Sequence, residues 1–149
     1  MKAIAIGCDP NAQEMKQTLI AHIKSMGYEV KDFGSEDPIY AEVAIRVAES
    51  VASGEHDRGI LVCGTGIGVS IAANKVPGAY AALCSNVYAA ERAQLSNNAN
   101  IITIGAFTTG IEVAKTIVSA WLNAKYVPGG RSEPKIQRIC DYEKEILER

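Results

Sequence analysis

The sequence predicts an α/β protein in a single domain, 1–149, with a five-stranded parallel sheet covered on both faces and an extra C-terminal helix. Apolar runs at 3–8 and 59–63 lack the alternation of a half-exposed strand, which is typical of strands buried on both faces. Segments with helical spacing separate the strands, and this alternation implies right-handed crossovers and a parallel sheet. A length of 149 residues leaves no room for a second domain and a linker.

The predicted strands are short stretches that begin or end near glycine, proline or small polar residues. The first is apolar up to Asp9, and the third reads GILVC before a glycine-rich turn. In chain order they occupy residues 3–8, 28–33, 59–63, 79–84 and 100–104.

The predicted helices have apolar residues at helical spacing and stop at helix-breaking residues. Gly27 ends the first helix, and Pro77-Gly78 ends the third. The second and fifth helices each have an apolar inner stripe, whereas the last helix is polar. In chain order they occupy residues 11–26, 38–53, 70–75, 86–96, 109–125 and 133–148.

Composition and charge exclude several classes of protein. Apolar residues make up 48% of the chain and charged residues 21%, which excludes a disordered or fibrous protein. A net charge of −2 gives no electrostatic footprint for a nucleic acid or an anionic membrane. No apolar stretch approaches the roughly 18 residues of a membrane span, and the start of the chain lacks a signal-peptide core. We therefore expect a cytoplasmic protein whose four cysteines are reduced.

The segment 63–70, CGTGIGVS, has glycines at three alternate positions. Gly64, Gly66 and Gly68 allow a sharp strand-to-helix turn and leave backbone N–H groups pointing outward at the helix start. This arrangement predicts an anion-binding turn, and the alternative is a tight turn without a ligand. The segment lacks the Gly-Lys-Ser/Thr of a P-loop, and its third glycine comes one residue early for a dinucleotide-binding pattern.

Cys63 is the last residue of the strand that leads into this turn. A helix N-terminus stabilises a thiolate beside it, so Cys63 could act as a nucleophile or a general base. The alternative is a buried core cysteine, which is the commoner role of this residue type. Cys8, Cys84 and Cys140 are expected to be packing residues.

Neither histidine is expected to work with the cysteine of the turn. His22 lies in the first helix, and His56 precedes strand 59–63 at the opposite end of the sheet. The chain has no C-x-x-C pair and no Cys/His spacing of a zinc site, so no metal centre is expected.

Two polar stretches later in the chain could bind a ligand or have a purely structural role. The stretch SNNAN at 96–100 could cap a helix and turn the chain, or present amides and hydroxyls to a polyol. Arg131 and Lys135, four residues apart at a helix start, could clamp a phosphate or be isolated surface cations.

Several segments together resemble the ribose-5-phosphate isomerase B and galactose-6-phosphate isomerase family. The resemblance is most specific in CGTGIGVSIAANKVPG at 63–78 and extends to 7–9, 27–34, 53–66, 96–100 and 129–131. It implies a three-layer α/β/α fold of Rossmann type, and a homodimer or homotetramer in which a neighbouring subunit completes each active site. It also implies interconversion of aldose and ketose phosphates through an enediolate, with no metal and no cofactor.

The resemblance implies roles for the matching residues. Cys63 would take the proton from carbon, the backbone of 64–68 would stabilise the enediolate oxyanion, and Thr65 would handle hydroxyl protons. Asn97 would reach the substrate across the subunit interface. The implied catalytic set is Cys63, Gly64, Thr65, Gly66, Ile67 and Gly68, and the implied substrate-binding set is Asp9, Tyr40, Ser70, Ser96, Asn97, Arg131 and Lys135.

Four positions depart from the pattern of the ribose-5-phosphate isomerases. Ser96 and Pro10 stand where histidine is usual, and Phe107 and Lys135 stand where arginine is usual. The absence of a ring-opening histidine favours a tetrose 4-phosphate, which has no free hydroxyl to close a five-membered ring. Ribose 5-phosphate is the second candidate. The alternatives are an isomerase of unphosphorylated or rare sugars, and a non-catalytic protein that binds a sugar phosphate.

Overall fold

The computed structural model describes residues 1–149 and contains a five-stranded parallel sheet. The strands are β1 (Ile4–Cys8), β2 (Val30–Asp32), β3 (Gly59–Cys63), β4 (Ala81–Leu83) and β5 (Ile101–Gly105). Their order in the sheet is β2-β1-β3-β5-β4. Every residue of β1, β3 and β5 is buried, as predicted for strands covered on both faces. β2 lies on one side of β1 in the sheet, and the next strand along the chain, β3, lies on the other side of β1. The strand order therefore reverses between β1 and β3, which is where sheets of this kind bind ligands.

The two edge strands are shorter than predicted. β2 and β4 pair over three residues each, whereas the sequence predicted strands over 28–33 and 79–84. An edge strand has a hydrogen-bonding neighbour on one side only, so its ends are not held by a second ladder.

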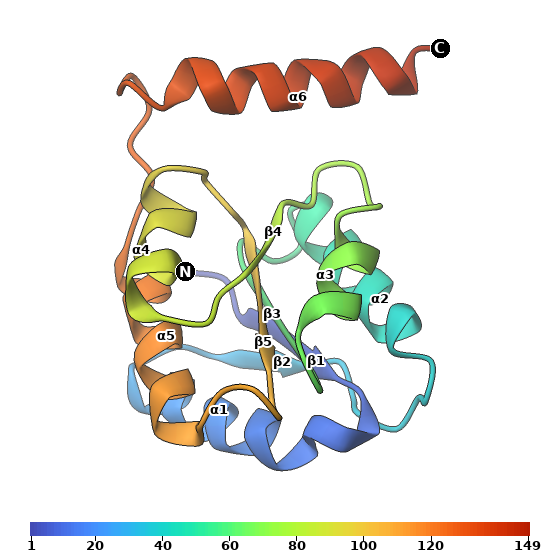
Figure 1. Cartoon of the computed structure of the whole chain (residues 1–149), viewed down its shortest axis with the longest axis vertical. Coiled ribbons are helices and arrows are strands. Elements are labelled where there is room, and N and C mark those ends of the chain that lie inside the picture. Colours follow the sequence, from blue (N-terminus) through green and yellow to red (C-terminus); the bar gives the residue numbers. More distant parts are fainter.

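Five helices cover the two faces of the sheet and form the predicted three-layer arrangement (Figure 1). The helices are α1 (Gln13–Ser25), α2 (Tyr40–Ala52), α3 (Ile67–Ala73), α4 (Val87–Leu95), α5 (Ile111–Asn123) and α6 (Glu133–Leu147), with a 3-10 turn η1 (Pro10–Ala12) before α1. Helices α1, α4 and α5 pack over one face, and α2 and α3 pack over the other. None of these helices combines the length and apolar character needed to cross a membrane.

A buried arginine fixes the end of α5 against the sheet. The guanidinium of Arg58 donates hydrogen bonds to the carbonyl oxygens of Trp121 (2.5 Å) and Ala124 (2.6 Å), and it lies 5.0 Å from the centre of the Trp121 ring. Hydrogen bonds from a charged donor contribute about 1.5 to 3 kcal/mol each. These contacts hold the C-terminal end of α5, from which the chain leads to α6.

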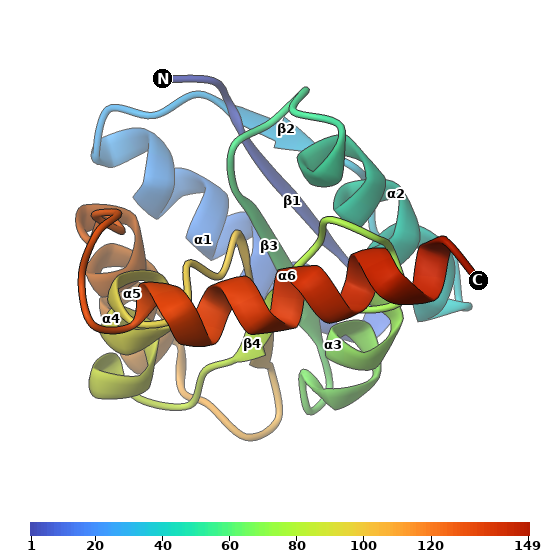
Figure 2. The same cartoon turned by 90° about the horizontal axis from the view of Figure 1, so that it is seen from above.

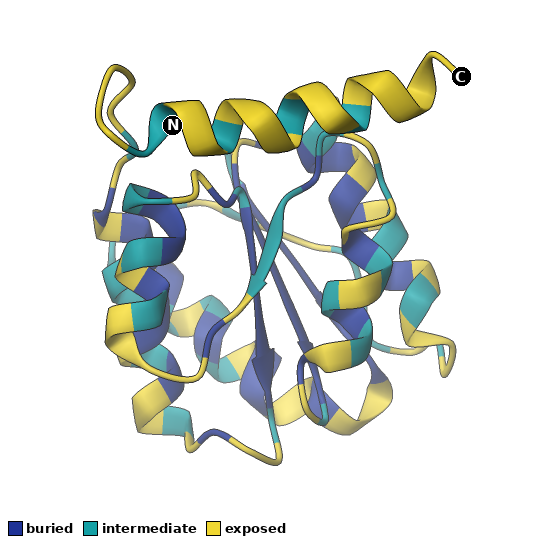
Figure 3. Ribbon diagram, turned by 45° about the horizontal axis from the view of Figure 1, so that its top comes forward, coloured by how far each residue is buried: buried dark blue, intermediate teal, exposed yellow.

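Helix α6 lies outside the three layers, across the amino-terminal ends of the strands (Figures 1 and 2). None of its residues is buried, and its apolar side chains Ile139, Tyr142, Ile146 and Leu147 are exposed (Figure 3). Glu143 holds it to the domain, since its Oε1 accepts hydrogen bonds from the backbone N–H of Gly78 (3.1 Å) and the hydroxyl of Tyr80 (2.8 Å). Cys140, expected as a packing residue, is only partly buried because it lies on this helix.

Candidate active site

A cleft of about 510 Å³ opens at the carboxyl ends of β1 and β3, at the point where the strand order reverses. It lies where the fold predicts a ligand site. Nine of its ten lining residues come from the loop after β1, the start of α2, the 63–68 turn and the loop after β5. The lining residues are Asp9, Asn11, Tyr40, Cys63, Gly64, Thr65, Ile67, Gly68, Ile71 and Phe107.

The glycine-rich segment turns the chain at a single residue. Gly66 has a φ of +78°, and the helix α3 begins at the next residue, Ile67. The sequence predicted a turn over 64–68 and a helix from Ser70, so the start of the helix was placed three residues too late. A Cβ atom on Gly66 would lie 2.6 Å from Leu83 Cδ1 and 3.0 Å from the carbonyl carbon of Ile104. Only glycine combines this conformation with this close approach.

Cys63 is buried in the wall of the cleft, with 6% of its surface exposed. Its Sγ accepts a hydrogen bond from the backbone N–H of Gly66 (3.1 Å). Its carbonyl oxygen accepts one from Ala106 (2.8 Å), and the carbonyl oxygen of Gly64 accepts one from Phe107 (2.9 Å). The sulfur is therefore held in one place, and a dipole that favours negative charge points at it.

Two other cysteines are unsuited to proton transfer. Burial raises the pKa of Cys8 to about 12 and the pKa of Cys84 to about 11, so both thiols remain protonated near neutral pH. Each side chain is about 1% exposed within the larger core cluster, which confirms the prediction that they are packing residues.

Three predicted site residues line the same cleft as Cys63 and carry polar groups. Asp9 is buried, and its Oδ1 accepts the backbone N–H of Asn11 (3.1 Å). Thr65 Oγ1 accepts the backbone N–H of Ile67 (3.2 Å), which leaves the hydroxyl proton available to a ligand. Tyr40, at the start of α2, is 41% exposed and lines the cleft.

The last glycine of the turn makes room for this tyrosine. A side chain at Gly68 would overlap the ring of Tyr40, so the glycine lets α2 and α3 approach one another. Ser70, the remaining predicted residue of this segment, lies on α3 and does not line the cleft.

The other predicted residues gather in a second hollow of about 360 Å³, beside the start of α6. Its lining residues are Arg92, Ser96, Asn97, Arg131, Ser132, Lys135, Ile136 and Ile139. The structure thus brings Ser96, Asn97, Arg131 and Lys135 together, but not beside Cys63. Ser96 and Asn97 precede β5, whereas Cys63 pairs with Gly105 at its far end.

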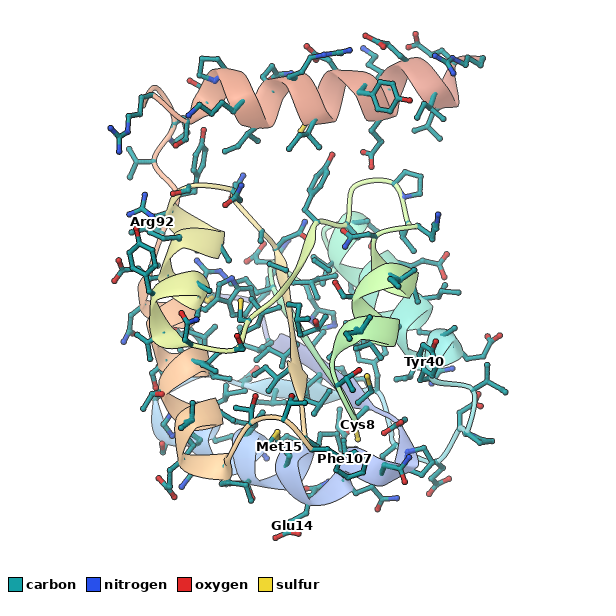
Figure 4. The ribbon with its side chains drawn as sticks, in the orientation of Figure 1. Cys8, Glu14, Met15, Tyr40, Arg92 and Phe107 are labelled. Atoms are coloured by element: carbon teal, nitrogen blue, oxygen red, sulfur yellow. The ribbon has the colours of Figure 1, made fainter.

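The length of β5 separates the two hollows within one chain. From Ile101 to Gly105 the strand takes four steps of about 3.3 Å, which is about 13 Å. Figure 4 shows Phe107 at one end of the sheet and Arg92 at the other. A ligand shorter than this span cannot contact both hollows of one chain.

Some lining residues were not predicted from the sequence. Asn11 and Ile71 line the cleft, and so does Phe107, a position that departs from the family pattern. Arg92 lines the second hollow, and its Nε donates a hydrogen bond to Ser96 Oγ (2.8 Å). The spacing of four residues on a predicted helix is the sequence signal for this pair.

The two histidines are engaged elsewhere. His22 Nε2 is 2.7 Å from Ser119 Oγ, and His56 Nδ1 is 2.9 Å from the carbonyl oxygen of Ala3. Neither lines the cleft. The structure contains no group of three or more His, Cys, Asp and Glu side chains that could hold a metal ion.

Comparisons with known proteins agree with this architecture. The family model described as ribose/galactose isomerase matches residues 4–139. A D-erythrulose-4-phosphate isomerase of Pectobacterium atrosepticum is 46% identical over 147 residues, covering 96% of each chain. A ribose-5-phosphate isomerase B of Escherichia coli is 44% identical and covers 96% of this chain and 97% of its own. The solved structure of the Clostridium thermocellum ribose-5-phosphate isomerase B has a TM-score of 0.91 and 44% identity, with 98% of this chain and 99% of that chain covered.

The fold and these relatives define an enzyme, a sugar-phosphate isomerase that interconverts aldoses and ketoses. The chain belongs to the ribose/galactose isomerase family, and within it to the ribose-5-phosphate isomerase B type. The family resemblance of the segment 63–78 is thereby confirmed.

Proposed function

We propose that this enzyme interconverts a tetrose 4-phosphate and a tetrulose 4-phosphate without a metal, with Cys63 as the base. The observation that carries the proposal is the position of Cys63, which lines the cleft and whose sulfur accepts the N–H of Gly66 at 3.1 Å. A base that must hold negative charge before it takes a proton benefits from such a donor.

In the proposed reaction, the Cys63 thiolate takes the proton from C2 of the open-chain aldose. The C–H electron pair forms the C1–C2 double bond, and negative charge develops on the carbonyl oxygen. The backbone N–H groups of Gly64 and Thr65 find no acceptor within the protein, so they are available to this oxygen. The Thr65 hydroxyl then moves a proton between O1 and O2, and the Cys63 thiol returns its proton to C1 to give the ketose. The reaction needs no external oxidant or acid because every proton removed is returned.

The residue at position 96 favours a tetrose over a pentose. Ribose 5-phosphate closes to a furanose ring that must open before isomerisation, and Ser96 is a much weaker acid and base than the histidine implied there by the family resemblance. A tetrose 4-phosphate carries its phosphate on the oxygen that would close such a ring. The similarity to the Pectobacterium atrosepticum enzyme supports this choice. Ribose 5-phosphate remains the second candidate, since the Escherichia coli relative is almost equally similar.

We further propose that the active site is shared between two copies of the chain, in a homodimer or homotetramer. The Cys63 cleft contains no lysine or arginine, whereas Arg131, Lys135 and Asn97 line the second hollow. An anionic substrate in the cleft therefore needs cations that its own chain does not place there. A second copy of the chain would bring its Asn97, Arg131 and Lys135 to this cleft.

Substitution of Cys63 tests the proposed function. Cys63→Ala should abolish isomerisation of erythrose 4-phosphate and of ribose 5-phosphate, and it should also stop exchange of the substrate C2 proton with D₂O. Cys140→Ser, a change to a partly exposed cysteine outside the cleft, should leave turnover unchanged. Normal turnover by Cys63→Ala would refute the role of the base.

The same assay tests the substrate class. The wild-type kcat/KM should be highest for erythrose 4-phosphate, lower for ribose 5-phosphate and lowest for the free aldoses. A preference for a free aldose would refute the requirement for phosphate. Calorimetric binding of sugar phosphates without any deuterium incorporation would instead indicate a non-catalytic binding protein.

A further inference from the structure

Arg92 and Ser96 form a linked pair at the end of α4. Arg92 Nε donates to Ser96 Oγ (2.8 Å), and the backbone N–H of Ser96 donates to the carbonyl oxygen of Arg92 (2.7 Å). Since the arginine occupies one lone pair of the Ser96 oxygen, the hydroxyl proton is left for another acceptor. The two Nη atoms of Arg92 have no hydrogen-bond partner in the protein, and the residue lines the second hollow.

The second hollow has an unbalanced positive charge. Arg92, Arg131 and Lys135 line it, no aspartate or glutamate lines it, and none of the three cations forms an ion pair. The nearby Glu133 is directed elsewhere, because its Oε2 accepts the N–H of Gly129 (2.8 Å). Three like charges around one cavity repel each other, and an anion that enters the cavity removes this cost.

We propose that Arg92 is a third phosphate-binding cation of this enzyme and that it orients the Ser96 hydroxyl as a donor to the same group. The inference rests on the proposed function, and it assigns the hollow to the phosphate end of the substrate. The planar guanidinium is fixed through Nε on one edge, so its two Nη atoms present a fork that matches two oxygens of a phosphate. The hydroxyl of Ser96 and the ammonium of Lys135 add further donors around the same cavity.

This arrangement makes Arg92 a specificity-determining residue. A neutral sugar hydroxyl gains little from three cations, whereas a phosphate dianion interacts with each of them. Arg92 should therefore discriminate phosphorylated from unphosphorylated substrates and contribute to KM more than to kcat.

Substitution of Arg92 separates this role from a structural one. For Arg92→Leu we expect the KM for erythrose 4-phosphate and the Kd for inorganic phosphate to rise about tenfold to a hundredfold, since a charged hydrogen-bond donor is lost. The kcat should change less than about threefold, because we expect Arg92 to bind the phosphate equally well in the ground state and in the transition state. Arg92→Lys keeps the charge but not the fork, so it should restore part of the phosphate affinity.

Arg138→Gln is the matched control. Arg138 lies on α6 near Lys135 but pairs with Glu145 (3.1 Å) and does not line the hollow. Arg138→Gln therefore removes one positive charge, as Arg92→Leu does, without changing a residue of the hollow. Its phosphate affinity should stay within about twofold of wild type. Equal phosphate affinity in Arg92→Leu and wild type would overturn the proposal, and so would an equal loss of affinity in Arg138→Gln.

Calorimetry with inorganic phosphate makes this test independent of catalysis. If no sugar phosphate is turned over by the wild-type enzyme, the proposed function fails, while the comparison of phosphate binding by wild type and Arg92→Leu still decides the role of Arg92. A loss of binding in Arg92→Leu supports the inference, and unchanged binding refutes it.

Discussion

Gly66 donates its backbone N–H to the Sγ of Cys63 across 3.1 Å, and the same glycine turns the chain with a φ of +78°. One residue thus sets both the path of the backbone into α3 and the position of the sulfur. Its positive φ lets α3 begin at the next residue while its amide N–H faces the sulfur three residues back. The geometry of the proposed base therefore depends on a backbone conformation that favours glycine.

Gly66→Ala should reduce both stability and activity. The variant places a Cβ in a left-handed conformation and against Leu83 and Ile104, so the free energy of unfolding should fall by about 1 to 3 kcal/mol. Displacement of the amide should lower kcat by at least about tenfold. Gly27→Ala is the control, because Gly27 also has a positive φ, has no atom within 4 Å of its added Cβ and lines neither hollow. It should lose about 1 kcal/mol in urea unfolding and retain kcat. Equal kcat values in the two variants would contradict the role of Gly66.

Mixed oligomers should recover activity from two inactive variants. Cys63→Ala removes the proposed base, and Arg131→Gln removes a cation from the other hollow, so neither variant alone should turn over substrate at the wild-type rate. The two variants are unfolded together and refolded, so that about half of the dimers contain one chain of each variant. Each such heterodimer has one intact site of two, which predicts roughly a quarter of wild-type activity. Cys63→Ala mixed with Thr65→Ala should recover nothing, since both changes affect the same cleft. The absence of recovery in the first mixture would exclude a shared site.

Ser96→His should improve turnover of ribose 5-phosphate relative to erythrose 4-phosphate. An imidazole can donate and accept protons near neutral pH, so it can assist opening of the furanose ring, a step that a tetrose phosphate does not need. We expect the ratio of the two kcat/KM values to shift by about tenfold or more toward the pentose. Ser96→Ala, which also loses the hydrogen bond from Arg92, is the control and should not shift the ratio. An equal ratio in Ser96→His and Ser96→Ala would contradict this explanation of substrate choice.

Local sequence patterns predicted a helix or strand correctly where all of its residues share the same degree of burial. The strand at 59–63 matches β3 in full, because each of its residues is buried on one face or the other and a glycine turn follows. The pattern failed where a tertiary contact decides the boundary. It does not show which of three alternate glycines takes the positive φ, so α3 was predicted to begin at Ser70 instead of Ile67. Edge strands were predicted too long, because apolar composition does not reveal that β2 and β4 have one neighbour each.

The sequence predicted which residues form the candidate site better than it predicted how they are arranged in space. Asp9 and Cys63 follow directly from the rule that ligands bind at the carboxyl ends of parallel strands. The separation of Ser96 from Cys63 follows from the direction of β5, and the resemblance to a family alone suggested a second subunit. The sequence does not identify Arg92 as a site residue, because an arginine on an isolated helix is expected to face solvent. Only the folded position of residues 131–135 beside α4 shows that Arg92 lines a hollow.

The ion pair of Lys16 and Asp32 makes stability depend on acid pH. Lys16 is 2% exposed, and its Nζ donates to Asp32 Oδ1 at 2.8 Å. Burial acts to raise the pKa of Asp32, but the hydrogen bonds from Lys16 and the Gly34 N–H outweigh it and lower the pKa below its ordinary value of 3.8. The folded state therefore favours the carboxylate, so the stabilisation is complete above about pH 5, begins to fall near the ordinary pKa of 3.8 and is lost as the pH falls through the lower folded value.

Asp32→Asn should leave the buried ammonium of Lys16 without its counter-charge. We expect the free energy of unfolding at pH 7 to fall by about 1 to 3 kcal/mol, a range reduced from that of a fully buried pair because Asp32 is 39% exposed. Asp57→Asn disrupts the exposed pair with Lys2 (3.7 Å) and should cost less than about 0.5 kcal/mol. In urea unfolding at several pH values, the difference between wild type and Asp32→Asn should be constant above about pH 5 and should shrink below pH 3.8 as the wild-type carboxyl takes up its proton. A difference that stays constant into the acid range would show that the carboxylate charge of Asp32 does not stabilise the fold.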